Sequence, residues 1–430
     1  MKMGNGRLGR SVSIIGAAYT PLGNVQESPE ILDFSERELV AMASIEAMQD
    51  AGITAKEIGA FYVGMSGPNY DAKMKSGGPF FADWIGLRNK STLFHDEGCG
   101  SQASGLHMAV MAVASGQYDC VITTAVNISK SVPKYAYPPH IRGEQDPDVM
   151  WGSIWTGIDA AYQKPGFGGV APLEAILVKY AATYNLTYAD LDQCFVNYLI
   201  SKRAEALLNP KALLVTETYE DEAKKFGFDS VKDFLLSNKF NPPMGTLIRA
   251  RFLGNVADGA SAVIVCASDK AKQYVKKPIE VAGISTATTL EKTFCELPLI
   301  VDKIMFKEAY AMAGITDPSK EVDYMGIHDC PATMILPVSE AAGYFKPGES
   351  FRYMTEGRLC FDSDKPITTS GGRTQSGHPR SPAFAVEVAE AISQMRGENG
   401  ERQMKNPPKT SVIWGGGSGF ANGVCVLKTL

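Results

Sequence analysis

The 430-residue sequence lacks several features that would place it in other classes of protein. No apolar run reaches the roughly 18 residues of a transmembrane helix, so no membrane partner is expected. The start of the chain has no apolar signal-peptide core, and the eight cysteines include no CxxC pair. Neither a zinc ribbon nor a disulfide framework is therefore expected, and the cytoplasm is the expected compartment. The formal net charge of −5 gives no basic footprint for nucleic acid.

What the sequence does contain is an alternation of β-prone runs and helical patterns. Runs at 11–16, 61–64 and 120–126 alternate with stretches of helical spacing such as 35–50, which stops at Gly52. This alternation predicts an α/β protein with a mostly parallel, buried sheet and helices outside it. The second half of the chain repeats the plan, which suggests a duplicated α/β unit with a site between the copies. In each half a strand end before a helix carries a reactive-looking residue, so we expect Cys99 of the first half to correspond to His328 and Cys330 of the second.

A long excursion interrupts the first copy. It is rich in proline, with tyrosines and tryptophans gathered at 135–162. An excursion of this length is usually functional. A cover over the sheet and a binding wall both remain open as its role. The predicted organisation is an N-terminal half at 1–128 plus 251–276, an inserted loop domain at 129–250 and a C-terminal half at 277–430.

The stretch His-Asp-Glu-Gly-Cys-Gly-Ser-Gln-Ala-Ser-Gly at 95–105 is the first candidate site. It has the pattern of a strand end, a glycine turn and the first turn of a helix, with Cys99 at the bend. A thiol at a helix N-terminus faces unpaired N–H groups and the positive end of the helix dipole, and both favour the thiolate. We therefore predict a nucleophilic cysteine; a buried, inert thiol is the alternative.

Three further stretches carry reactive or glycine-rich patterns. His328 and Cys330 flank a predicted helix start before Pro331, where zinc binding is the rival interpretation but no further ligand pair supports it. A glycine-rich loop at 370–379 ends in Gly-His-Pro and has no P-loop pattern. The glycines at 415–419 could bring backbone N–H groups to a ligand, although a plain hairpin turn would have the same composition.

Taken together, four of these motifs resemble the thiolase superfamily in their order and spacing. They are Cys-Gly-Ser at 99–101, His-Asp-Cys at 328–330, Gly-His-Pro at 377–379 and Gly-Gly-Gly-Ser-Gly at 415–419. The resemblance covers nearly the whole chain. It implies the thiolase fold, in which two duplicated βαβαβαββ halves form a five-layered α-β-α-β-α arrangement with an inserted loop domain.

The resemblance also implies a role for each site residue. Cys99 would be the nucleophile that carries the acyl group as a thioester. His378 would activate it and help to bind the thioester oxygen, with His328 binding that oxygen or the enolate oxygen. The backbone N–H groups of Cys99 and Gly415 would form a second oxyanion hole.

One position departs from the usual thiolase pattern. Many thiolases carry a second cysteine two residues before the triple glycine, where this chain has Ile413. The His-Asp-Cys order instead resembles the sterol-carrier-protein-type thiolases and their archaeal and bacterial relatives. In that branch Cys330 would serve as the acid/base thiol.

The implied activity is CoA-dependent thiolysis of a 3-oxoacyl-CoA. CoA would be a substrate, and no metal is expected in this chain. The tyrosines and tryptophans at 135–162 would suit a bulky or aromatic acyl group, such as that of 2-benzoylsuccinyl-CoA. Alternatively, they would simply form core or subunit contacts. The alternatives are Claisen condensation to acetoacetyl-CoA or a related product, retro-aldol cleavage, and a non-catalytic acyl-CoA-binding subunit.

The implied partners are a second copy, as a homodimer core, and a small zinc-ribbon/OB-fold protein. Such a partner could complete the CoA site, because the 130–170 stretch offers few cations for its phosphates. These cations are Lys130, Lys134, Arg142 and Lys164.

Overall fold

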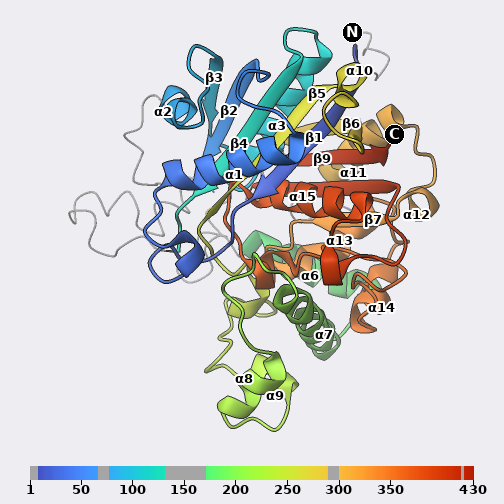
Figure 1. Ribbon diagram of the computed structural model, residues 1–430. Helices are drawn as coiled ribbons and strands as arrows, with labels where there is room; N and C mark the ends of the chain where they lie inside the picture. The colour runs from blue at the N-terminus through green and yellow to red at the C-terminus, as the bar shows by residue number, and fades with distance from the viewer. Residues whose placement is uncertain (1–7, 66–76, 131–170, 289–299, 418–420) are drawn as a thin grey trace.

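The computed structural model describes residues 8–65, 77–130, 171–288, 300–417 and 421–430 (Figure 1). Nine strands of these residues form one sheet, in the order β3-β2-β4-β5-β1-β6-β9-β8-β7. The strands are β1 (Val12–Tyr19), β2 (Ala60–Met65), β3 (Ser91–His95), β4 (Cys120–Asn127), β5 (Gly259–Ala267), β6 (Ile279–Thr288), β7 (Tyr324–Ile327), β8 (Thr410–Gly417) and β9 (Ala421–Thr429). Among the described helices, none has both the length and the apolar character needed to cross a bilayer.

The sheet is mixed, so the prediction of a mostly parallel sheet is wrong. Only β2 with β3, β2 with β4 and β7 with β8 are parallel; the other pairings are antiparallel. Periodicity shows that a strand is buried on both faces but does not show its direction. Burial here comes from helices on both faces, and that pattern is shared by parallel and antiparallel strands.

The helices divide the sheet into layers. Helices α3 (Ser101–Ala114) and α15 (Ala383–Arg396) pack against each other and touch strands of both halves of the sheet. Helix α1 (Glu36–Ala51) covers the outer face of β1, β4 and β5, and α11 (Ile300–Ala313) covers β6 and β9. This gives the predicted order of layers, in which each half of the sheet counts as one layer. The order is α1, the first half of the sheet, the pair α3 and α15, the second half of the sheet, and α11. The shorter helices are α2 (Gly77–Trp84), α10 (Ser268–Ala271), α12 (Pro318–Glu321), α13 (Ile335–Ala341) and α14 (Glu349–Thr355).

Local sequence explains where helix α1 begins and ends. The Ser35 N–H donates to the Glu38 carboxylate at 2.7 Å, and the Ser35 side chain in turn accepts from the backbone at Glu38, which forms a capping box. Gly52 ends the helix with φ of +63°, in the left-handed region that glycine adopts easily. The predicted glycine stop at this position is confirmed.

The two halves of the sheet repeat one topology. The order β2-β4-β5-β1 in the first half corresponds to β7-β8-β9-β6 in the second. The counterpart of β3 is reduced to a single bridge between Met325 and Ile367. The turn before α3, which holds Cys99, therefore corresponds to the turn before α15, which holds His378. The predicted correspondence of Cys99 with His328 and Cys330 is wrong, because those two residues follow β7, the counterpart of β2.

Four helices from the long excursion pack on the second half of the sheet. Their apolar side chains share one core with Met305, Ile327, Ile335 and Met354. In Figure 1 the last two of these helices project from the bottom of the molecule. The four are α6 (Ala171–Tyr184), α7 (Tyr188–Leu207), α8 (Tyr219–Lys225) and α9 (Val231–Leu236). The boundaries predicted for the inserted domain stay a prediction, and the aromatic stretch at 135–162 lies outside the described residues.

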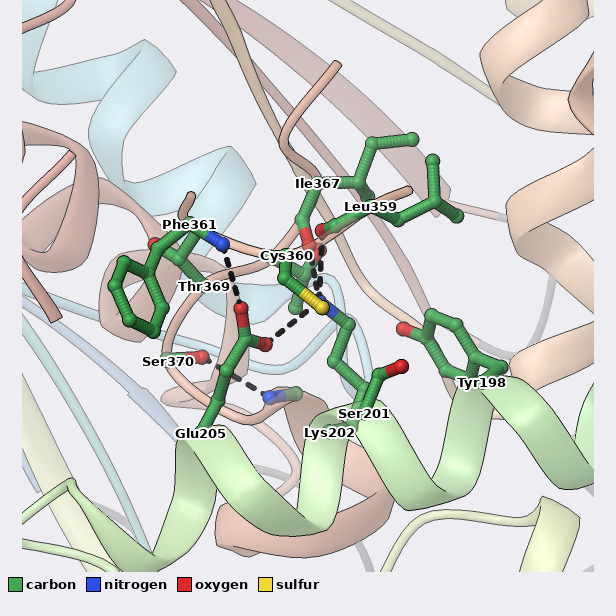
Figure 2. A network of polar contacts seen from close by, with 12 residues as sticks. Tyr198, Ser201, Lys202, Glu205, Leu359, Cys360, Phe361, Ile367, Thr369 and Ser370 are labelled. Atoms are coloured by element: carbon green, nitrogen blue, oxygen red, sulfur yellow. Dashed lines mark hydrogen bonds and ion pairs between the residues drawn. The ribbon is translucent and has the colours of Figure 1, made fainter. Parts of the chain in front are cut away.

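A buried ion pair fastens α7 to the loop that precedes the His378 turn (Figure 2). Lys202 is fully buried, and its ammonium donates to the Glu205 carboxylate at 2.7 Å and to the carbonyls of Leu359 and Ile367 at 3.0 and 2.6 Å. The second carboxylate oxygen of Glu205 accepts the Phe361 N–H at 2.9 Å. Both charged groups of the pair are thus hydrogen-bonded. Such bonds are needed to offset the free-energy cost of removing a buried ion pair from water.

Replacing one member of this pair should destabilise the fold. Glu205→Gln leaves the Lys202 ammonium without its counter-charge, and we expect a loss of about 3 kcal/mol in the free energy of unfolding. Urea unfolding at pH 7 measures it. The double variant Lys202→Met/Glu205→Leu should recover most of the loss. The exposed-pair control Lys320→Met should not move the midpoint. A loss below about 1 kcal/mol in Glu205→Gln would contradict the assigned importance of the pair.

Candidate active site

Cys99 lies in a tight turn between β3 and α3. Gly98 has φ of +59°, and its N–H donates to the Asp96 carboxylate at 2.9 Å. The Ser101 hydroxyl accepts the Glu97 N–H and donates to the Gly98 carbonyl at 2.7 Å. The turn places Cys99 two residues before the first residue of α3, where the glycine-rich sequence predicted it.

The thiol of Cys99 is protonated in the free protein. Burial of the sulfur raises the pKa of this thiol to about 11, against the smaller lowering effects of Arg380 and a backbone N–H. The loss of hydration acts against the acidifying effect expected at the helix start and is the largest influence on this pKa. A nearby base is therefore needed to take the proton.

His328 and Cys330 follow β7 directly. The His328 N–H donates to the Trp414 carbonyl at 3.1 Å, which continues the pairing of β7 with β8. The Cys330 sulfur accepts the Gly254 N–H at 3.3 Å. A Cβ at Gly254 would lie 2.8 Å from this sulfur, so a side chain there would push the two segments apart.

His378 lies beside His328 and Cys330 but belongs to another loop, the one before α15. Its backbone forms a bridge with the segment before β5, in which the His378 N–H donates to Asn255 at 2.7 Å and its carbonyl accepts from Ala257 at 3.1 Å. The ring centroids of His378 and His328 are 4.9 Å apart. The ligand atoms of His328, Cys330 and His378 all lie within 4.8 Å of one another. Three of the four predicted side chains therefore meet.

Cys99 is close enough to this group to act on Cys330 electrostatically. Burial, and next the negative charge of a Cys99 thiolate, raise the pKa of Cys330 to about 12, so the two sulfurs interact electrostatically. The Ser381 hydroxyl donates to the Gly98 carbonyl at 3.2 Å. This bond ties the turn that holds Cys99 to the loop that holds His378.

Both imidazole rings of the group are neutral. Burial, and next the charge of Arg373, lower the pKa of His328 to about 3. Burial, and next His328 and Arg380, hold the pKa of His378 well below its usual value. His328 Nδ1 and His378 Nε2 are buried, and neither has a hydrogen-bond partner in the part of the chain that the structure describes. Such nitrogens can accept a proton from a thiol or donate a hydrogen bond to a substrate oxygen.

The carboxylate of Asp329 connects the two histidine segments. It is fully buried and accepts the Arg373 N–H at 2.5 Å, the Thr374 hydroxyl at 2.8 Å and the Tyr198 hydroxyl of α7 at 2.9 Å. A Cβ at Gly372 would lie 2.2 Å from this carboxylate. Only glycine at 372 lets the loop approach so closely.

The sequence analysis missed the residues that surround the predicted four. Asp329 had a signal, because it is a charged residue between two predicted site residues at a strand end. Arg373 lies within the glycine-rich loop at 370–379 but was not singled out there. Tyr198 had no signal, since its contact with Asp329 joins distant segments. Arg380 follows the Gly-His-Pro motif directly and could have been noted as a cation beside a predicted base.

Gly415 lies in β8 opposite Gly423 of β9. A Cβ there would meet Phe384 at 2.6 Å, so a side chain does not fit. Its N–H as an oxyanion donor stays a prediction, and the neighbouring residues 418–420 lie outside the described residues. Ile413, at the position of the usual second cysteine, is fully buried in the core between the two halves of the sheet.

His328, Cys330 and His378 also have the chemistry of a zinc ligand set, two imidazoles and one thiol. The same three groups are the ones the predicted acid–base chemistry needs. The prediction that the chain works without a metal stays a prediction.

Comparison with known proteins identifies the family. The family model described as Thiolase C-terminal domain-like matches residues 304–429. The acetyl-CoA acetyltransferase of Methanothermobacter thermautotrophicus is 25% identical over 401 residues, which are 92% of this chain and 94% of that protein. Subunit BbsB of the benzoylsuccinyl-CoA thiolase of Thauera aromatica is 28% identical over 170 residues, which are 38% and 43% of the two chains. Over most of its length the chain is similar to proteins of the thiolase superfamily.

Solved structures show the same fold. The Ltp2-ChsH2(DUF35) aldolase aligns with a TM-score of 0.73 at 16% identity and 98% coverage of both chains. The human mitochondrial 3-ketoacyl-CoA thiolase aligns with a TM-score of 0.66 at 15% identity, covering 98% of this chain and all of that one. The predictions of the thiolase fold and of an acyltransferase enzyme are confirmed at this level.

The raised thiol pKa gives the thiolase site a testable pH dependence. Because the pKa of Cys99 is about 11 and both histidines are neutral, the thiolate fraction should rise about tenfold per pH unit from pH 7 to 10. Iodoacetamide labelling of Cys99, followed by peptide mapping, should show this slope with no plateau below about pH 10. A plateau near pH 7 would instead reveal a thiolate–imidazolium pair in the free enzyme.

Proposed function

We propose that this protein cleaves a 3-oxoacyl-CoA with CoA, through an acyl-cysteine intermediate. The observation that carries the proposal is the meeting of Cys330 with two neutral imidazoles, His328 and His378, beside the Cys99 turn. Such a set supplies a nucleophile, a base, a second acid and oxyanion donors. The full-length relatives named acetyl-CoA acetyltransferase support thiolase-type chemistry on acyl-CoA.

The first half-reaction begins with proton transfer from the Cys99 thiol to His378. The thiolate attacks C3 of the substrate, and the N–H groups of Cys99 and Gly415 are proposed to hold the resulting alkoxide. The C2–C3 bond then breaks, and its electrons form a thioester enolate whose oxygen accepts hydrogen bonds from His378 and His328. Cys330 protonates C2, which releases a shortened acyl-CoA and leaves an acyl group on Cys99.

The second half-reaction returns every proton. The Cys330 thiolate takes the proton of the incoming CoA thiol, and the CoA sulfur attacks the acyl-Cys99 thioester. The tetrahedral intermediate collapses to acyl-CoA, and the Cys99 thiolate regains its proton from His378. Both thiols have raised pKa values in the free protein, so each is protonated at rest and can act as an acid. Claisen condensation uses the same groups in reverse.

A cavity beside the site supports a route for CoA. It has a volume of about 410 Å³ and is lined near the site by Gly254, Asn255 and Thr374, and farther away by Arg203 and Arg251. Both arginines share the Glu222 carboxylate. We infer that the pantetheine arm passes Gly254, whose N–H contacts Cys330. The cations at the far end would face the CoA phosphates.

Partner proteins also belong to the proposal. Strand β3 is an edge strand of the described sheet and exposes Leu93 and Phe94, each with more than a third of its surface accessible. An exposed edge with apolar side chains favours pairing with a second copy. A small partner protein is supported by two comparisons, since BbsB is a subunit and the aldolase structure contains a DUF35 protein.

Removal of the nucleophile tests the mechanism. Cys99→Ala should abolish both thiolysis and the acyl-enzyme adduct that mass spectrometry detects, because no sulfur remains to attack C3. The matched control Cys360→Ala removes a thiol that bonds to Gly357, away from the site, and should keep activity. Thiolysis retained in Cys99→Ala would disprove the acyl-cysteine intermediate.

The acyl group is tested separately. We expect thiolysis of an aromatic 3-oxoacyl-CoA, such as 2-benzoylsuccinyl-CoA, to exceed that of acetoacetyl-CoA in kcat/KM by about tenfold, the size expected when extra apolar surface is buried in a pocket. Steady-state rates on both substrates measure the ratio. A strong preference for acetoacetyl-CoA would rule out the aromatic substrate and leave the thiolase activity in place.

A further inference from the structure

Arg380 occupies a constrained position beside the site. It follows His378 by two residues and precedes α15, and its φ is +57°, in a region that non-glycine residues enter rarely. The chain around it is fixed: the Ser381 N–H donates to the Asn127 side chain at 3.2 Å, and the Ser381 hydroxyl donates to Gly98 next to the nucleophile. Strained backbone of this kind is found at functional sites.

The charge of Arg380 has no partner among the residues that the structure describes. Twelve arginines lie in the described residues, and eleven of them form a hydrogen bond, an ion pair or a ring contact. Within those residues Arg380 is the exception, although it is partly buried. Arg373 shows the contrast, because its guanidinium bonds to Glu387, Ser370 and the Gly377 carbonyl.

The charge of Arg380 acts on the reacting groups, because its segment joins His378 to the turn that holds Cys99. After burial, Arg380 is the strongest influence on the thiol of Cys99, and its charge also reaches Cys330 and His378. A guanidinium remains charged at all relevant pH values, and its planar fork binds a carboxylate through two parallel hydrogen bonds. A guanidinium in this position, with no partner among the described residues, is available to a carboxylate of a ligand.

We propose that Arg380 binds a carboxylate on the acyl group of the substrate. The substrate class is then the CoA thioester of a 3-oxo dicarboxylic acid, an assignment that rests on the proposed thiolase function. CoA phosphates are excluded as the ligand, because the pantetheine arm separates them from the thioester that reacts with Cys99. A neutral 3-oxoacyl chain would leave the guanidinium without a counter-charge when substrate displaces water from the site.

The test uses two substrates of equal chain length, 3-oxoadipyl-CoA and 3-oxohexanoyl-CoA. The wild-type enzyme should prefer 3-oxoadipyl-CoA by at least about tenfold in kcat/KM. Arg380→Met should reduce this ratio to about 1, and Arg380→Lys should retain part of it because the charge remains without the fork. The control Arg352→Met removes an exposed arginine paired with Glu349 and should keep both the activity and the ratio.

A binding measurement separates this inference from the proposed reaction. Calorimetry with the Cys99→Ala enzyme should give a Kd about tenfold lower for 3-oxoadipyl-CoA than for 3-oxohexanoyl-CoA, and Arg380→Met in that background should remove the difference. That result supports the carboxylate site even if neither substrate is cleaved, in which case the proposed function alone fails. Equal Kd values, or an equal loss of kcat/KM on both substrates in Arg380→Met, would overturn the inference and assign Arg380 to the Cys99 thiolate instead.

Discussion

The buried Asp329 carboxylate is the interaction on which the arrangement of the site depends. Its three donors come from the loop at 372–376 and from Tyr198 of α7, while its own backbone lies between His328 and Cys330. One charged group thus fixes the end of β7 against the loop that leads to His378. A buried charge is costly unless its hydrogen bonds are satisfied, so these segments have a strong energetic reason to stay together.

Burial also determines the protonation states in the site. It raises the pKa of both thiols and lowers the pKa of both imidazoles, so the neutral forms dominate before substrate binds. In the proposed mechanism, the nucleophile is therefore generated only when a proton moves from Cys99 to His378. In this scheme, hydrogen bonds from the oxyanion donors offset the free-energy cost of that proton transfer as negative charge develops on the substrate. The catalytic advantage then lies in the transition state and not in the resting enzyme.

The sequence was sufficient to find the residues of the proposed site, since Cys99, Cys330 and His378 stand in short motifs at strand ends and helix starts. It could not find strand direction, because burial on both faces hides it. It also misplaced the counterpart of Cys99 in the second half. Tyr198 could not be predicted for another reason. Its hydrogen bond with Asp329 joins residues 131 positions apart, and no local sequence pattern indicates such a pairing.

The repeated topology explains why the site lies where it does. The turns that hold Cys99 and His378 precede α3 and α15, the two helices of the central layer, which pack against each other. Equivalent turns of the two halves therefore come together, and the Ser381 bond to Gly98 joins them directly. His328 and Cys330 come from the end of β7, a position whose counterpart after β2 lies outside the described residues. The duplication thus brings the proposed nucleophile and its base from equivalent turns of the two halves, whereas the second thiol and the Asp329 carboxylate come from the end of β7.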